Sequence, residues 1–243
     1  MKSLTLNRLE NYPFEVTESI NQLRVNLSFT DKDMKRIVIT SAIPNEGKST
    51  IALALWRSLA GIGKKTLLID CDLRLSQYRT ECQMTTDEVF VGTAHVLSGQ
   101  NDIQDVIYKT NVPNGYMIPV TSLINNPGIL LESHRMNELM EQVYDVFDYI
   151  IIDTPPLASV ADPLAVIKNA DASILVVRSG CAKKTLVKES VEKLRKTGKP
   201  LLGMVLNGVD TSAHGSYYYK DYGDYYGNYD PDAQKKGKNI WEL

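Results

Sequence analysis

Runs of consecutive apolar residues alternate along this chain with segments in which apolar residues recur every three or four positions. Continuous apolar runs are typical of strands buried on both faces of a parallel sheet, and the longer spacing is typical of helices. The pattern therefore predicts an α/β fold. Strands are expected at residues 36–41, 66–70, 148–153, 173–178 and 201–207, with a weaker one at 115–120, and helices at 16–28, 49–60 and near 136–147 and 187–194.

The two ends of the chain do not share this alternation. Residues 1–33 hold a helix that precedes the first strand, so we expect this segment to lie outside the sheet or against another subunit. A domain is expected at 34–210 and a tail at 211–243. Because no segment approaches the roughly 20 apolar residues of a membrane span, and no apolar signal core begins the chain, we expect a cytoplasmic protein.

Composition narrows the class of protein only a little. The chain has 243 residues, of which 43% are hydrophobic and 23% charged, which suits one α/β domain with tails. The formal net charge of -2 gives no reason to expect a nucleic-acid partner. Cys71, Cys82 and Cys181 show neither a disulfide framework nor zinc spacing, so three reduced thiols are expected.

A candidate phosphate-binding loop, residues 42–49, follows the first long apolar run and opens a predicted helix. It matches the P-loop pattern except that Ala42 stands where the first glycine is usual, and alanine tolerates positive φ poorly. Backbone N–H groups at such a helix N-terminus bind anions, and Gly47 lets the backbone approach phosphates. Lys48 is expected on the β- and γ-phosphates, and the Ser49 hydroxyl on Mg²⁺. An ordinary turn before a helix is the alternative.

Three carboxylates follow predicted strands. Asp70 and Asp72 come at the end of the strand at 66–70, and Asp153 ends the strand at 148–153. The carboxyl ends of parallel strands form the ligand-binding edge of such a sheet, so these groups should lie near the loop at 42–49. Beside a nucleotide they suggest Mg²⁺ coordination and a general base. Helix capping, or pairing with Arg74 and lysines, is the alternative.

Tyrosines crowd together near the C-terminus, with Gly, Asp, Asn and Lys between them and no aliphatic residue from 215 to 232. Such a segment cannot bury a core of its own and should be mobile. It is either a low-complexity tail or a set of phosphate acceptors. The tyrosines are Tyr217, Tyr218, Tyr219, Tyr222, Tyr225, Tyr226 and Tyr229.

Four segments in order, TSAIPNEGKST, LLIDCDLR, YIIIDTPP and GMVLNGVD, resemble those of the bacterial tyrosine kinases of capsule and exopolysaccharide operons, P-loop NTPases related to the MinD and ParA ATPases. The resemblance implies a three-layer sandwich with a mostly parallel sheet, and a kinase that uses ATP and Mg²⁺ to phosphorylate its own tyrosine cluster. It assigns Asp70 as base, Lys48 as a catalytic group, and Ser49, Asp72 and Asp153 to the metal. Nucleotide contacts fall on Asn45, Glu46, Gly47, Lys48, Ser49, Thr50 and, near the adenine, Asn207.

The resemblance also implies partners. The cytoplasmic tail of a membrane activator of the polysaccharide chain-length regulator type would recruit the kinase to the membrane, and other tyrosine proteins would be substrates. A homo-oligomer is expected, and our own hypothesis is that the tail of one subunit in it enters the active site of the next. The family's ring motif, Glu-x-x-Arg-x-x-Arg, corresponds here to Glu18, Asn21 and Arg24, and Leu75-Ser76 replaces the usual Lys-Pro. The missing arginine puts a ring in doubt.

Two other functions fit parts of the pattern. A MinD/ParA-like regulatory ATPase would share the scaffold and the aspartates, but that group carries an extra lysine near the start of its P-loop, where this chain has Ser41-Ala42-Ile43-Pro44, and it lacks a tyrosine tail. A non-catalytic, nucleotide-binding adaptor would accommodate Ala42 and Asn21. The kinase is the interpretation that uses all the motifs.

Overall fold

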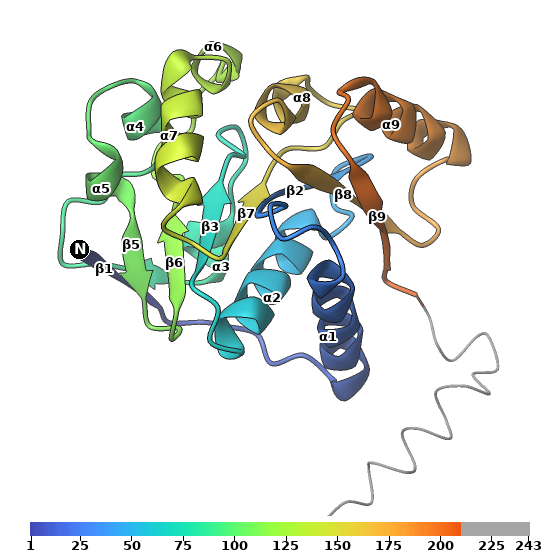
Figure 1. The fold of residues 1–243 in the computed structure, drawn as a ribbon, viewed down its shortest axis with the longest axis horizontal. Helices are drawn as coiled ribbons and strands as arrows, with labels where there is room; N and C mark the ends of the chain where they lie inside the picture. Colours follow the sequence, from blue (N-terminus) through green and yellow to red (C-terminus); the bar gives the residue numbers. More distant parts are fainter. Residues whose placement is uncertain (210–243) are drawn as a thin grey trace, which may run out of the picture. The chain divides into compact units, whose positions relative to one another are not determined.

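A nine-stranded sheet organises the part of the chain that the computed structural model describes, residues 1–209 (Figure 1). The strand order is β4-β1-β5-β6-β3-β7-β2-β8-β9, and neighbours are parallel except in the pairs β1–β4 and β5–β6. The predicted mostly parallel α/β sheet is therefore confirmed. The strands are β1 (Lys2–Leu6), β2 (Arg36–Ser41), β3 (Thr66–Asp70), β4 (Met84–Thr85), β5 (Tyr108–Thr110), β6 (Gly115–Ile118), β7 (Tyr149–Asp153), β8 (Ala172–Arg178) and β9 (Leu201–Asn207).

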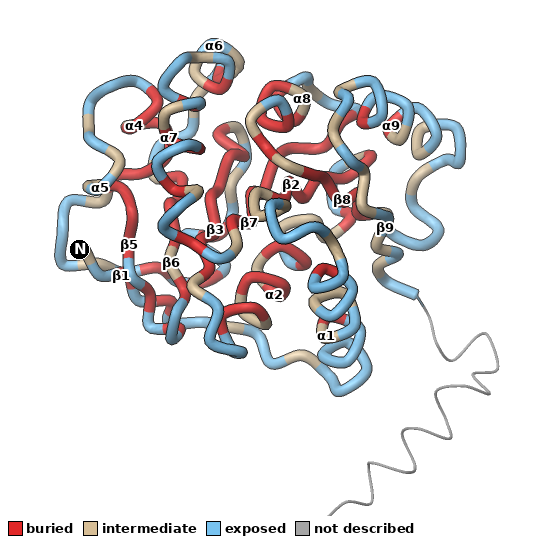
Figure 2. The backbone as a smooth tube through the Cα atoms, in the orientation of Figure 1, coloured by how far each residue is buried: buried red, intermediate tan, exposed pale blue. Residues whose placement is uncertain are grey.

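Helices cover both faces of the sheet and give the expected three layers. One core cluster joins the sheet to α1 (Phe14–Ser28), α2 (Lys48–Gly61) and α3 (Tyr78–Glu81). The other cluster lies on the opposite face, where Figure 2 shows the strands as the buried centre. The helices of that second layer are α4 (Thr93–Leu97), α5 (Ile103–Val106), α6 (Gly128–Leu131), α7 (His134–Tyr144), α8 (Asp162–Ile167) and α9 (Lys184–Lys196).

The central strands show why continuous apolar runs mark this architecture. Ile37, Val38 and Ile39 of β2 are all fully buried, because β2 has helices on both faces. Helix α2 is fixed to the sheet by Trp56, whose indole N–H donates to the carbonyl oxygens of Thr66 and Tyr116, each at 3.1 Å. These two hydrogen bonds anchor α2, which begins at the predicted phosphate loop, to strands β3 and β6.

The segment before the first predicted strand differs from expectation. Residues 2–6 form β1 and pair with β5 and β4, and the apolar side chains of Leu4 and Leu6 are buried. Helix α1 packs against α2, so the unit of the fold extends from Met1 to Asn207 and has no boundary at residue 33. The expected role of residues 1–33 in an oligomer stays a prediction.

Other sequence expectations have mixed outcomes. The three cysteines are free, as predicted. The helices of the described region include none that is long and apolar enough to cross a membrane. The seven tail tyrosines lie outside the described residues, so their proposed role stays a prediction.

Candidate functional site

The loop between β2 and α2 has the backbone of a phosphate cradle. Gly47 occupies the N-cap of α2 with φ of 88°, and Asn45 also has a positive φ, 63°. The positive φ of residue 47 favours glycine, and a Cβ atom there would lie 2.2 Å from the side-chain nitrogen of Asn207 and displace it from the loop. The first backbone N–H groups of α2 have no intrahelical acceptor, which makes this end of the helix suited to an anion.

Ala42 does not disturb the loop. Its φ is not positive, its side chain is fully buried, and its carbonyl oxygen accepts a hydrogen bond from the Ala158 amide at 3.0 Å. The concern about the first turn therefore does not hold. Glu46 is buried as well, and its carboxylate accepts from the amides of Ile43 (2.9 Å) and Arg178 (3.2 Å). Its side chain thus shapes the loop and ties it to β8.

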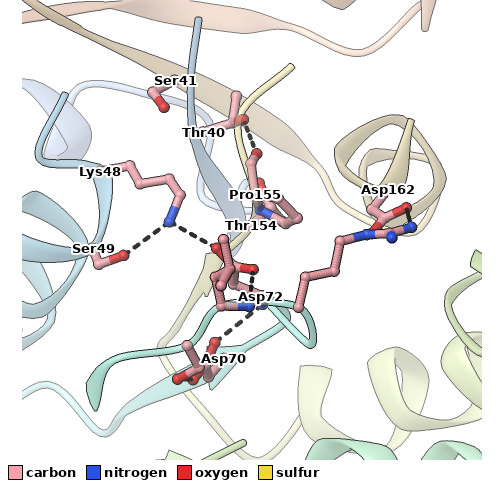
Figure 3. A network of polar contacts seen from close by, with 12 residues as sticks. Thr40, Ser41, Lys48, Ser49, Asp70, Asp72, Thr154, Pro155 and Asp162 are labelled. Atoms are coloured by element: carbon pink, nitrogen blue, oxygen red, sulfur yellow. Dashed lines mark hydrogen bonds and ion pairs between the residues drawn. The ribbon is translucent and has the colours of Figure 1, made fainter. Parts of the chain in front are cut away.

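Lys48 points toward the aspartates at the end of β3 (Figure 3). Its Nζ lies 3.0 Å from Oδ2 of Asp72 and 3.1 Å from Oγ of Ser49. Burial alone would lower the pKa of Lys48, but the carboxylates of Asp153 and Asp72 outweigh it and raise that pKa. Lys48 is therefore a fixed positive charge beside the loop, held by a carboxylate that a phosphate can replace.

Asp70 is fully buried behind this ion pair. One carboxylate oxygen accepts a hydrogen bond from the Asp72 amide at 3.1 Å, and the other accepts from the hydroxyl of Ser76. Burial and the nearby Asp153 raise the pKa of Asp70 to about 8, which places its titration near neutral pH. Ser76, one of the two residues that depart from the family pattern, thus contacts the predicted base directly.

Asp153 is the one buried carboxylate without a partner in the described residues. It lies beside Asp70 on the neighbouring strand. Neither of its oxygens forms a hydrogen bond of normal geometry with the described residues, although the hydroxyls of Ser49 and Tyr78 lie near enough to lower its pKa. Burial raises the pKa of Asp153, and the charge of Lys48 offsets part of that rise. An unsatisfied buried carboxylate is costly to keep, so this side chain is suited to a group that the polypeptide itself does not supply.

Two contacts that the sequence did not predict fix the segment after Asp72. Arg74 was considered as a partner of the strand-end aspartates but pairs elsewhere, and Tyr78 was not singled out. The guanidinium of Arg74 forms a two-pronged ion pair with Asp162, at 2.7 and 3.1 Å. The buried Tyr78 hydroxyl donates to the carbonyl oxygen of Ser49 at 2.9 Å, which links this segment to the first turn of α2. The only sequence signal for these contacts is closeness to Asp72, because the partners are far apart along the chain.

The fold brings most of the predicted site together. The amide of Asn207, at the end of β9, donates to the carbonyl oxygen of Glu46 at 2.9 Å, so it lies against the loop. Thr50 is exposed in the first turn of α2. Within residues 1–209, no cluster of three or more His, Cys, Asp or Glu side chains is arranged to hold a metal ion unaided. The residues gathered at the carboxyl edge are Asn45, Glu46, Gly47, Lys48, Ser49, Asp70, Asp72, Asp153 and Asn207.

The chain resembles known proteins over most of its length. Residues 34–202 match the profile of a family described as "AAA domain". The chain is 38% identical over 208 residues to the tyrosine-protein kinase CpsD of Streptococcus agalactiae, a match that covers 86% of this chain and 89% of that protein.

Solved structures give the same result. The kinase domain of the Escherichia coli tyrosine kinase ETK superposes with a TM-score of 0.75 at 29% identity, covering 87% of this chain and 86% of that one. The cell division ATPase MinD of Pyrococcus furiosus superposes with a TM-score of 0.59 at 27% identity, covering 71% and 72%. The similarity to the kinase domain is therefore greater and extends over more of the chain.

Proposed function

Because the chain belongs to the AAA-domain family and, within it, to the bacterial tyrosine-protein kinases, we propose that it transfers the γ-phosphoryl group of ATP to tyrosine hydroxyls. Its first substrates are the tyrosines of its own segment 217–229. The placement of Lys48 between the phosphate loop and the Asp70–Asp72 pair, with Asp153 beside them, supports phosphoryl chemistry, and the 38% identity with a tyrosine-protein kinase favours the kinase over the regulatory ATPase. We infer a role in capsular or exopolysaccharide synthesis and export.

The described residues fit ATP with Mg²⁺. The loop would offer backbone N–H groups and Lys48 to the phosphates, and we propose that Asn207, whose amide lies against the loop, contacts the base. Ser49, Asp72 and Asp153 would hold the ion, whose role is to neutralise charge on the phosphates. Because the chain alone offers no three-ligand cluster, phosphate and water oxygens would complete the ligand set.

The protein's own contribution is positioning and proton transfer. Lys48 would exchange its ion pair with Asp72 for contacts with the phosphates. The carboxylate of Asp72 would then be free to bind Mg²⁺. Asp70 orients the tyrosine hydroxyl and takes its proton, and the raised pKa of Asp70 suits a base that works near neutral pH. Since Asp70 is fully buried and bonded to Ser76, the segment 73–77 has to move before a tyrosine can reach it.

The partners remain those that the family implies. We propose a homo-oligomer, other tyrosine-containing substrates, and a cytoplasmic kinase that a membrane activator recruits through its cytoplasmic tail. Asn21, where the ring motif has an arginine, accepts from the Ser58 hydroxyl at 3.3 Å and donates to Glu18 at 2.8 Å. The Ser58 contact links α1 to α2 inside one subunit. Arg24, on which a ring would depend, also donates to the Ser58 hydroxyl, at 3.2 Å.

Intact-mass spectrometry after incubation with ATP and Mg²⁺ tests the proposal. The wild-type chain should gain phosphates one at a time, mapped by peptide fragmentation to Tyr217–Tyr229, and a Lys48→Met chain should gain none. A wild-type chain that hydrolyses ATP yet gains no phosphate, with or without an activator tail, would instead support the MinD/ParA-like ATPase.

A further inference from the structure

The two edges of the sheet are built differently. At one edge the strand is β4, only two residues long, which leaves little backbone for another chain to pair with. At the other edge β9 is seven residues long, and within the described part of the chain it pairs with β8 alone. Met204 and Leu206 of β9 are each 60% exposed. A long, apolar edge strand of this kind is a template for a further strand.

The exposed side chains of β9 lie on the face that α9 covers. Met204 is paired in register with Leu175, and Leu206 with Val177, and both β8 partners belong to or pack on the core cluster that contains Leu194 of α9. Val205, between them, packs on the other cluster, as the alternation of a strand requires. The apolar edge and α9 therefore form one surface.

Helix α9 and its flanks carry a strong positive charge, in a chain whose net charge is -2. No side chain of this set forms an ion pair within residues 1–209. The cations are Lys183, Lys184, Lys188, Lys193, Arg195, Lys196 and Lys199, against which stand only Glu189 and Glu192.

The basic side chains divide between two flanks of α9. Lys193 donates to the carbonyl oxygen of Leu157 at 3.2 Å, so its flank faces the loop after β7. At about 100° per residue, Lys184, Lys188 and Arg195 lie roughly 140–180° around the helix from Lys193, on the flank toward β9. All three are exposed.

This surface leads to the site. Strand β9 runs parallel to β8 and ends at Asn207, whose side chain contacts the phosphate loop. A segment bound along β9 is therefore directed at the nucleotide. We use the term β9 edge surface for Lys184, Lys188, Arg195, Met204 and Leu206.

We propose that the β9 edge surface binds the tyrosine-rich segment 217–232 of a second copy of this chain and guides its tyrosines to the phosphate loop. The inference rests on the proposed function. The segment has complementary chemistry, because aromatic side chains suit the apolar strand and its four aspartates suit the basic flank, with Lys220 as its one cation. Those aspartates are Asp221, Asp224, Asp230 and Asp232.

An anionic membrane is the competing occupant. Lipid phosphates would satisfy the basic side chains and accept hydrogen bonds from backbone N–H groups. They offer no donor to the outward carbonyl oxygens of an edge strand, whereas a peptide strand supplies both donors and acceptors. The length of β9 therefore favours the peptide.

Binding can be measured without catalysis. A fluorescent peptide of residues 215–232 is titrated with the full-length Lys48→Met chain, and its anisotropy gives the Kd. The triple variant Lys184→Glu, Lys188→Glu, Arg195→Glu should weaken binding at least tenfold. A matched triple, Lys32→Glu, Lys109→Glu, Lys168→Glu, changes the net charge equally at exposed positions elsewhere and should change the Kd less than twofold.

A charge swap keeps the test independent of misfolding. A peptide with the four aspartates replaced by lysine should bind the β9 edge triple variant more tightly than it binds the parent chain. Equal affinities of the parent and the β9 edge triple variant for the native peptide, or loss of binding only to phosphatidylserine vesicles, would overturn the proposal. The binding assay involves no phosphoryl transfer. A failure of the docking proposal can therefore be distinguished from a failure of the kinase proposal.

Discussion

At the phosphate loop the charged side chains are buried and all but Asp153 have a partner, whereas along the β9 edge surface they are exposed and form no ion pair among the described residues. Near the loop, Lys48 is held at 3.0 Å by Asp72, and Asp70 is held by Ser76, so geometry is set before any ligand arrives. On α9, Lys184 and Lys188 have no ion pair among the described residues. Buried groups in fixed positions suit chemistry, since little reorganisation is needed. Exposed charges suit recognition, which is reversible and sensitive to salt.

The largest difference between the two regions should appear when the same substitution is made in each. Lys48→Met removes a buried charge that contacts the phosphates, so phosphoryl transfer should fall by about 10³-fold or more. Lys184→Met removes an exposed charge and should lower transfer less than about fivefold. Initial rates of phosphotyrosine formation at saturating ATP measure both. Comparable losses in the two variants would contradict the division of roles.

Two glycines with similar positive φ, Gly47 in the phosphate loop and Gly63 after α2, allow the effect of backbone strain to be separated from that of steric contact. Gly47→Ala places a methyl group 2.2 Å from the Asn207 side chain, so nucleotide affinity should fall about 100-fold. Gly63→Ala has a similar φ, 85°, but no atom lies within 4 Å of the added Cβ, so it carries the strain alone. Calorimetric titration with ATP should show normal affinity for Gly63→Ala. Equal affinities in the two variants would mean that the loop does not close on Asn207.

The pH dependence of stability tests the buried acid. The pKa of Asp70 rises from 3.8 to about 8 on folding, so between these pH values the folded chain binds one more proton than the unfolded chain. The free energy of unfolding contributed by Asp70 therefore falls as pH rises through that window. Asp70→Asn should raise stability without nucleotide at pH 8 by on the order of 3 kcal/mol, and by little at pH 4.

Thermal denaturation at both pH values measures this effect. Asp171→Asn serves as the contrast, because Asp171 pairs with Arg36 at 2.6 Å and its loss should lower the melting temperature at pH 8. Destabilisation by Asp70→Asn at pH 8 would show that Asp70 is ionised and well satisfied in the folded chain.

The smallest effect is expected at the exposed edge. Leu206→Ser alters a side chain that is 60% exposed, so the free energy of unfolding should change by less than about 0.5 kcal/mol. Leu68→Ala, at a fully buried position of β3, should cost about 2–5 kcal/mol. Urea denaturation compares the two. A large loss from Leu206→Ser would mean that β9 is part of the core and not a free binding edge.

Sequence patterns predicted the central sheet because those strands are apolar on both faces. Strand β1 was missed, since only Leu4 and Leu6 face the core and its outward residues are polar. Strands β4 and β5 were missed because two or three residues carry no periodicity. Short strands at a sheet edge are fixed by their neighbours, which the local sequence does not contain.

The candidate site divides in the same way. The positions of the motifs directly after strands predicted that Lys48, Asp70 and Asp153 lie at one edge of the sheet, because the carboxyl ends of parallel strands lie side by side. The contacts of Ser76 and Tyr78 depend on how the segment after Asp72 folds back, and no spacing rule predicts that. The sequence also did not reveal that Ala42 is tolerated in the loop, because that depends on its φ, which is not positive.

The most direct measurement of the central claim is the number of phosphotyrosines formed per ATP consumed during the first turnovers. A kinase should give a ratio near one for the wild-type chain, because the γ-phosphoryl group passes to Tyr217–Tyr229 and not to water. A chain in which these seven tyrosines are phenylalanine should then consume ATP much more slowly. A ratio near zero, with ATP consumption unchanged by the seven substitutions, would contradict the kinase and identify a nucleotide-driven switch.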